Sequence, residues 1–104
     1  MHKMMALHDH MEDELKDGKS YAECASQCKD TDHELCDLYL QMAKERLEAF
    51  KRLKQSASRI YENKVRQAKD AGKDVTDFVE FYEYCSKKMA DKESSLAKCI
   101  EAVR

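Results

Sequence analysis

A run of regularly spaced positions near the end of the sequence most constrains what this chain can fold into. Apolar and semi-polar residues alternate three and four apart, the spacing that lines one face of an α-helix. Such a face must be buried on another helix, so the pattern predicts a helical bundle. The seam consists of Val75, Phe78, Tyr82, Cys85, Met89, Lys92, Leu96, Cys99 and Val103, with Lys92 as its one charged member.

The composition favours helices along the whole chain. It has no Pro, two Gly and no Trp, and it is rich in Ala, Leu, Glu, Lys, Met and Gln, residue types that are typical of helices. Its 104 residues predict one domain, 1–104, that can bury a modest core without disulfides or metal. We expect an all-α protein: an antiparallel three-helix bundle with a long central helix, completed by homodimerisation.

Capping signals divide the chain into three predicted helices. Thr31 and Glu34 form an S/T-x-x-E capping box, which places the start of the second helix near Asp32. Gly72 ends that helix, and Asp74 or Thr76 caps the next. The expected helices span about 4–29, 32–71 and 75–103.

Small residues line the second half of the first predicted helix. Gly18, Ala22 and Ala25 recur at four-and-three spacing, which lets a neighbouring helix approach closely. Gly18 costs roughly 1 kcal/mol of helix propensity relative to Ala. We therefore expect Gly18 to be present for packing.

The predicted second helix changes character along its length. Between Leu35 and Leu53 it carries two adjacent apolar stripes, which need two neighbours, whereas only one narrow stripe follows. We therefore expect the first helix to cover only the first half, leaving an aromatic-rich end of two helices. Exposed apolar surface of this kind usually marks an interface, which predicts a homodimer through Ile60, Tyr61, Val65, Phe78, Phe81 and Tyr84. The alternative is a bend at residues 56–58 that folds this end back.

The charge balance argues against several function classes. Lys and Arg number 19 and Asp and Glu 21, a net charge of −2, which gives no sustained basic field for nucleic acid. The first ten residues lack the apolar core of a signal peptide, and no apolar run approaches the length of a membrane span. We therefore expect a cytoplasmic protein that binds neither nucleic acid nor membrane. The sequence shows no catalytic triad or phosphate-binding loop, so we also expect a non-enzymatic protein that needs no cofactor.

The cysteines leave one further function open. Their number is five, and no spacing forms a paired C-x-x-C motif, so neither a disulfide framework nor a zinc module is indicated. Cys24 and Cys28 lie one helical turn apart and Cys36 follows the turn, an arrangement compatible with thiol-based sensing. Cys85 and Cys99 occupy seam positions, where free Cys behaves as a small hydrophobe. We expect reduced thiols with a structural role.

Acidic residues supply the main alternative function. In di-metal bundles, facing helices project Glu residues and Glu-x-x-His pairs inward. Most acidic residues here have a Lys or Arg three or four positions away, which is typical of a solvated face. The alternative is a carboxylate bundle that binds iron or manganese, with candidate ligands Glu12, Glu14, Glu45, Glu48 and His8, and with His10 as a further imidazole.

The stretch from Met11 to Leu53 resembles the first hairpin of small ferritin-like, or rubrerythrin-like, proteins of bacteria and phages. The resemblance rests on an acidic first helix followed by Tyr21-Ala22-Glu23, Glu34-Leu35, Asp37-Leu38-Tyr39 and Glu45-Arg46-Leu47-Glu48-Ala49. Such relatives commonly carry Glu-x-x-His at the last point, and the best-matching register places Arg46 and Ala49 there. The resemblance implies a helical bundle with a degenerate metal motif, because neither guanidinium nor methyl coordinates iron.

Two cations occupy predicted core positions, Arg46 on the second helix and Lys92 in the seam of the third. We interpret them as replacing the charge that a metal supplies in the resembling family. Buried cations need carboxylate partners, so we expect an internal charge network of Arg46, Lys92, Glu14, Glu45 and Glu93. The alternative is that Lys92 extends along its stem to solvent. The expected function is a self-associating module that presents charged helix faces to a protein partner.

Overall fold

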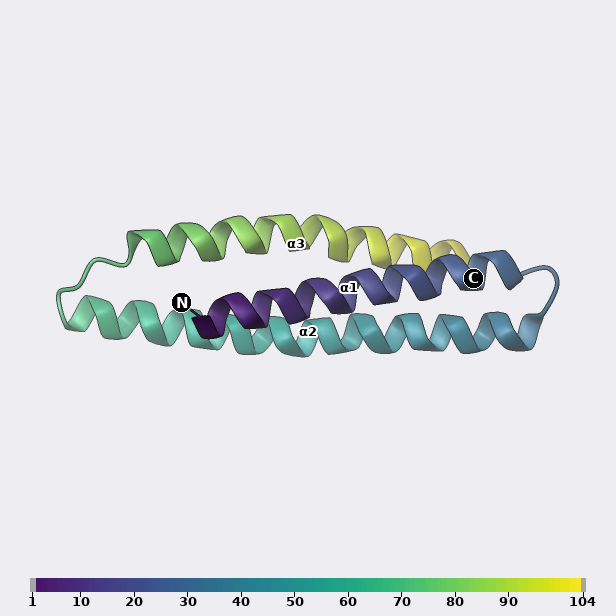
Figure 1. Ribbon diagram of the computed structural model, residues 1–104, viewed down its shortest axis with the longest axis horizontal. Coiled ribbons are helices and arrows are strands. Elements are labelled where there is room, and N and C mark those ends of the chain that lie inside the picture. Colours follow the sequence, from purple (N-terminus) through teal and green to yellow (C-terminus); the bar gives the residue numbers. More distant parts are fainter. Residues whose placement is uncertain (1, 104) are drawn as a thin grey trace.

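The computed structural model describes residues 2–103, which form three α-helices and contain no strand (Figure 1). α1 spans His2–Cys28, α2 spans His33–Asp70 and α3 spans Thr76–Val103. The chain runs along α1, returns along the longer α2 and runs forward again along α3 (Figure 1). The prediction of an all-α chain with three helices and a long central one is confirmed.

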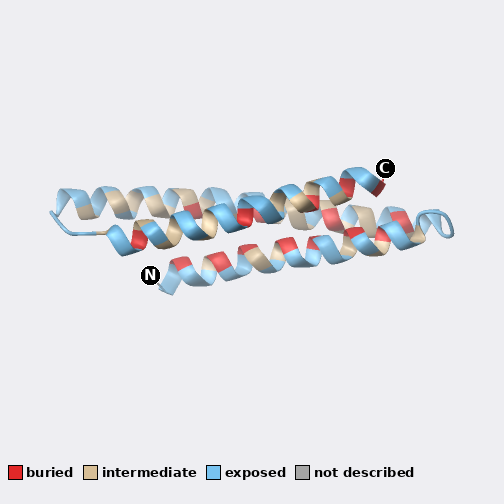
Figure 2. Ribbon diagram, turned by 90° about the horizontal axis from the view of Figure 1, so that it is seen from above, coloured by how far each residue is buried: buried red, intermediate tan, exposed pale blue. Residues whose placement is uncertain are grey.

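The three helices form a thin rod. Its extents are 61 × 18 × 17 Å, and its radius of gyration is 17.0 Å, compared with roughly 13 Å for a compact domain of this length. Buried residues therefore follow the inner face of each helix along the rod (Figure 2). No helix within residues 2–103 has an apolar stretch long enough to cross a bilayer. The largest fully buried side chains are those of Met4, Phe50 and Leu96.

Contacts between α1 and α2 define how far α1 reaches along its neighbour. Glu14 pairs with Arg46, and the rings of Tyr21 and Tyr39 stack with centroids 6.4 Å apart. This register places the start of α1 beside about residue 58 of α2. α2 therefore continues for about twelve residues beyond the start of α1, which is ~18 Å at 1.5 Å per residue. Figure 1 shows that end of the rod with α2 and α3 alone.

The start of α2 differs from the sequence-based expectation, and its middle decides between the two alternatives that the sequence left open. Asp32, and not Thr31, is the N-cap residue, because its Oδ1 accepts a 3.0 Å hydrogen bond from the backbone N–H of Leu35. α2 also runs unbroken through residues 56–58. The bend offered as the alternative to a two-helix end is therefore not formed.

The turn between α2 and α3 is closed by backbone geometry. Gly72 has a φ of +67°, its N–H donates to Lys69 O, and the N–H of Lys73 donates to Ala68 O. This is the Schellman arrangement, which satisfies the last carbonyls of a helix. Asp74 then accepts hydrogen bonds from Thr76 N and Oγ1 at 2.9 and 2.6 Å, which lower the pKa of its carboxyl.

Gly18 lies where α1 packs against both other helices. A Cβ at this position would lie 2.7 Å from Leu96 Cδ2 on α3 and 3.2 Å from Arg46 Cβ on α2. Both separations are shorter than ordinary van der Waals contacts. The packing reason expected for Gly18 is therefore present in the structure.

Candidate functional site

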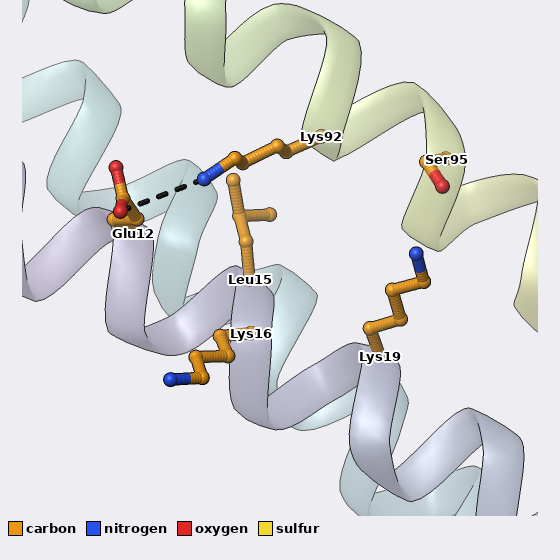
Figure 3. Close-up of a pocket in the computed structure, with 6 residues that line it drawn as sticks. All are labelled: Glu12, Leu15, Lys16, Lys19, Lys92 and Ser95. Carbon is orange, nitrogen blue, oxygen red and sulfur yellow. Dashed lines mark ion pairs between the residues drawn. The ribbon is translucent and has the colours of Figure 1, made fainter.

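A charged groove lies between α1 and α3 (Figure 3). It has a volume of about 190 Å³. Leu15 closes its floor and is only 2% exposed. The walls are formed by side chains of opposite charge and one hydroxyl. The lining residues are Glu12, Leu15, Lys16 and Lys19 from α1 and Lys92 and Ser95 from α3.

Glu12 is held at one end of this groove by two lysines of α3. Its carboxylate oxygens lie 3.2 Å from Lys88 Nζ and 3.5 Å from Lys92 Nζ. The hydrogen bond from Lys88 is the main reason that the pKa of Glu12 is lowered, and the same bond raises the pKa of Lys88. The side chains of Glu12, Lys88 and Lys92 are 41–45% exposed, so the cluster is a surface network.

The other end of the groove holds unneutralised positive charge. Lys19 forms no ion pair with any residue from 2 to 103. Lys19 points across the groove toward Ser95, whereas Lys92 points the opposite way, toward Glu12 (Figure 3). The groove therefore has an acidic end, at Glu12, and a basic end, between Lys19 and Ser95.

The predicted internal charge network is only partly assembled. Arg46 Nη1 lies 3.0 Å from Oε2 of Glu14 and donates a 3.4 Å hydrogen bond to its Oε1. Lys92 lies on the exposed side of α3 and pairs with Glu12 instead of the predicted partners. Of the other predicted members, Glu93 pairs with Lys54 at 3.1 Å and Glu45 accepts a hydrogen bond from Gln41. The predicted network is thus replaced by separate contacts on different faces.

Lys92 extends outward because of its position relative to α1. Its side chain is 44% exposed, and its stem crosses the outer edge of the α1–α3 contact (Figure 3). A long aliphatic stem can cover apolar surface while its ammonium group stays in water. The alternative that Lys92 extends to solvent describes the structure better than a buried cation does.

The candidate metal ligands do not converge. Among residues 2–103, no three His, Cys, Asp or Glu side chains are grouped so that they could hold a metal ion. Glu12 faces the lysines of α3 and Glu14 faces α2. Glu48 and Glu45 are exposed on α2, beside Arg52. The predicted ligand set with His8 is therefore not assembled, and His10 is exposed.

His8 occupies an unusual environment for a polar side chain. It is 5% exposed, and neither ring nitrogen has a hydrogen-bond partner within the described residues. Its ring contacts those of Phe81 and Tyr82, with centroid separations of 5.6 and 5.8 Å. Burial lowers the pKa of His8, and the nearby charge of Asp9 opposes this shift. Burial therefore favours the neutral form of this imidazole, which lies in an aromatic setting.

The predicted dimer residues divide into buried and exposed ones. Phe78 is buried, stacked beside Tyr61 at 5.7 Å and covered by the ammonium group of Lys64 at 4.8 Å. Tyr61 also stacks on Tyr82, with centroids 3.9 Å apart. Tyr84 is 68% exposed. Ile60, Val65 and Phe81 are half-buried.

A second groove lies beyond the start of α1, between the end of α2 and the start of α3. Val65, Val75 and Val79 contribute apolar surface to it. The α2 wall is basic and the α3 wall is acidic. The charged and polar lining residues are Lys69, Lys73, Asp74, Thr76 and Glu80.

Charge is segregated along this end of the rod, a feature that the net charge of the whole chain hides. From Lys51 to Lys73 the sequence has eight Lys or Arg residues and two acidic residues. From Asp74 to Glu83 it has four acidic residues and no basic one. A charge count in short windows reveals this signal, whereas the total of −2 conceals it.

Two of the cysteine thiols, those of Cys28 and Cys85, are less acidic than usual. The pKa of Cys28 is raised, chiefly by burial and further by Asp32, Cys36 and Cys24, so these thiols lie near one another as predicted. The pKa of Cys85 is raised by burial as well. A raised pKa keeps a thiol protonated and less reactive, which argues against Cys28 as the reactive thiol of a sensor.

Comparison with protein-family models, with curated proteins and with solved structures found no match to this chain. The ferritin-like resemblance therefore stays a prediction.

Proposed function

We propose that this chain is a non-enzymatic interaction module that self-associates as a two-fold homodimer through its two-helix end. The observation that carries the proposal is the length of α2 beyond the start of α1, which leaves the groove at Val65 and Val79 without a third helix. Contiguous apolar surface outside a core usually marks an interface. A second copy supplies two further helices and completes a local four-helix bundle.

The chemistry of the groove supports a copy of the same chain as its partner. A two-fold interface joins the same patch on both copies, so the patch must be complementary to itself. The basic wall at Lys69 and the acidic wall at Glu80 meet this requirement if α2 of one copy faces α3 of the other. The alternative, α2 against α2, would bring like charges together across the interface.

The apolar part of the proposed interface differs from the sequence-based list. Phe78 packs within its own chain, so it is not available to contact the partner. Ile60, Val65 and Tyr84 retain exposed surface, and Val79 is an addition that the groove lining suggests. The other charged helix faces stay free to contact a protein partner.

A mixing experiment tests this arrangement. Lys69→Glu and Glu80→Lys each place like charges across the interface, so each variant alone should dimerise more weakly than the parent chain. Mixed together, the two variants form a heterodimer with two such contacts. At one contact both residues are substituted, so opposite charges face each other again. At the other contact Lys69 faces Glu80, as in the parent chain. Light scattering coupled to size-exclusion chromatography at low salt should show monomers separately and dimers in the mixture.

The control is Lys29→Glu, the same charge change on an exposed residue in the turn at the opposite end of the rod. It should leave the mass unchanged. Repulsion within one chain cannot explain recovery in the mixture, because mixing does not alter contacts inside a chain. A parent chain that stays monomeric at high micromolar concentration contradicts the proposal.

A further inference from the structure

The groove between α1 and α3 has features that the proposed dimer does not use. It lies along the covered part of the rod, away from the groove at Val65 and Val79. Three lysines and one carboxylate line it, so it carries excess positive charge. In the described part of the chain, Lys16 and Lys19 form no ion pair, and of these two lysines only Lys19 points toward Ser95 (Figure 3).

Two hydrogen-bond donors converge at the basic end of the groove. The ammonium group of Lys19 comes from α1 and points toward the hydroxyl of Ser95 on α3 (Figure 3). An oxyanion between them would accept hydrogen bonds from both helices. Hydrogen bonds from a cation to a carboxylate are about twice as strong as neutral ones. This end therefore suits a compact anionic group.

The rest of the groove suits a short apolar segment. Leu15 closes the floor, and the methylene stems of Lys16 and Lys92 border it (Figure 3). Its volume of about 190 Å³ exceeds the roughly 150 Å³ of a cavity that accepts benzene. The space therefore fits a chain or ring of about six to eight carbon atoms.

We infer that this groove binds a small anionic amphiphile, a monocarboxylate with a short apolar tail. The carboxylate lies between Lys19 and Ser95, and the tail lies over Leu15 toward Lys92. The opposite orientation is disfavoured because Glu12 already occupies that end and would repel the carboxylate. The inference does not depend on dimerisation, since no residue of the other groove takes part.

Three probes separate the contributions of the head and the tail. Octanoate carries both, acetate has only the carboxylate, and octanol has only the tail. Titration of the ¹⁵N-labelled full chain, followed by NMR at the amides of Leu15 and Ser95, should give saturable shifts with octanoate. Acetate and octanol should each bind about tenfold more weakly or show no saturation, since each lacks one set of contacts.

Substitutions test the assigned orientation. Lys19→Gln should weaken octanoate binding about tenfold, as expected for loss of a hydrogen bond to a charged group. Ser95→Ala should weaken it to a smaller extent. Glu12→Gln should strengthen it, because a negative charge leaves the groove. Lys98→Gln, the same loss of charge on an exposed residue of α3, should bind like the parent chain.

Three results would overturn the inference. One is the absence of saturable shifts with octanoate below its aggregation concentration. Another is equal octanoate affinity in Lys19→Gln and Lys98→Gln, which would mean that only general surface charge attracts the anion. Saturation by octanol as strong as by octanoate would also contradict it. Circular dichroism confirms that each variant keeps its helices.

Discussion

Gly18 on α1 sits directly against Leu96 on α3, and no β-carbon fits between them. The missing atom would lie 2.7 Å from Leu96 Cδ2 and 3.2 Å from Arg46 Cβ. Leu96 is fully buried, so its side chain has little room to move. The separation between α1 and both other helices therefore depends on this one glycine.

Gly18→Ala should lower the free energy of unfolding. Alanine gains roughly 1 kcal/mol of helix propensity, but overpacking a filled core costs about 1–3 kcal/mol, so a net loss of about 1 kcal/mol is expected. Urea unfolding followed by circular dichroism, at one fixed protein concentration, measures it. In a Leu96→Ala background the closest contact disappears and only the 3.2 Å approach to Arg46 Cβ remains, so the same substitution should cost less or become stabilising. A stabilising Gly18→Ala in the parent chain would show that α1 packs less closely than described.

Arg46 and Lys92 should differ in their importance for stability. Arg46 faces a carboxylate oxygen of Glu14 that is buried, whereas Lys92 faces the more exposed Glu12. Arg46→Met should therefore cost about 1 kcal/mol, because it leaves a buried charge without its cation. Lys92→Met should change stability by less than about 0.5 kcal/mol, as is usual for surface ion pairs.

A double-mutant cycle checks the origin of the Arg46 effect. Glu14→Gln removes the charge that Arg46 neutralises, so Arg46→Met should cost less in that background than in the parent chain. Equal costs in both backgrounds would assign the effect to lost packing of the arginine stem. A large loss in Lys92→Met would restore the idea of a network around that residue.

Stability should fall with acid because of His8. Its folded-state pKa is lowered by burial, so below the ordinary value of about 6.5 the unfolded chain binds a proton that the folded chain does not. The contribution of His8 to the free energy of unfolding is thus complete above about pH 6.5, and it is lost as the pH falls toward the folded-state pKa. The free energy of unfolding should be measured between pH 7.5 and 5.5, which covers this window. This pH interval lies above the one in which most carboxylates titrate.

His8→Phe should flatten the pH dependence in that range. The aromatic setting of Phe81 and Tyr82 accepts a phenyl ring, so the variant should fold. The groups near His8 are Asp9 and Glu12 on α1 and Cys85 and Lys88 on α3. His10→Gln, a change on the exposed face of α1, is the control and should keep the slope of the parent chain. If His10→Gln flattens the slope and His8→Phe does not, the assignment to His8 is wrong.

Gly72 should be sensitive to any side chain for a backbone reason alone. Its φ is +67°, and no atom lies within 4 Å of the position that a Cβ would take. Gly72→Ala should therefore cost about 1 kcal/mol through left-handed strain, and Gly72→Asn should cost less because Asn tolerates this conformation better. Thermal unfolding compares the two, and an equal loss in both variants would point to steric contact instead.

Sequence patterns were sufficient to predict the helices, because helix periodicity and the signals at helix ends are local. The three-four spacing of α3 and the helix break at Gly72 depend on residues that are near neighbours in the sequence. The role of Gly18 follows from its place on a helix face that must be buried. The N-cap residue of α2 was predicted one position too early, since Thr31 and Asp32 both have suitable oxygens and only the backbone geometry decides between them.

The side-chain partners were harder to predict, because they depend on how the helices are rotated and shifted relative to one another. A small rotation of α3 places Lys92 at the edge of the contact with α1 and joins it to Glu12 rather than to a buried carboxylate. The isolation of His8 among aromatic rings likewise requires the register of α1 against α3. The charge segregation from Lys51 to Glu83 was available in the sequence, but it is invisible in the total charge.

The maximum dimension of the particle in solution tests the proposed assembly most directly. One chain is 61 Å long, and overlap of two such rods over the ~18 Å by which α2 extends past α1 gives a length of roughly 105 Å. Small-angle X-ray scattering at a concentration where light scattering reports twice the monomer mass should therefore give a maximum dimension near that value. A dimer about as long as one chain would mean side-by-side association, and a monomer at all concentrations would contradict self-association altogether.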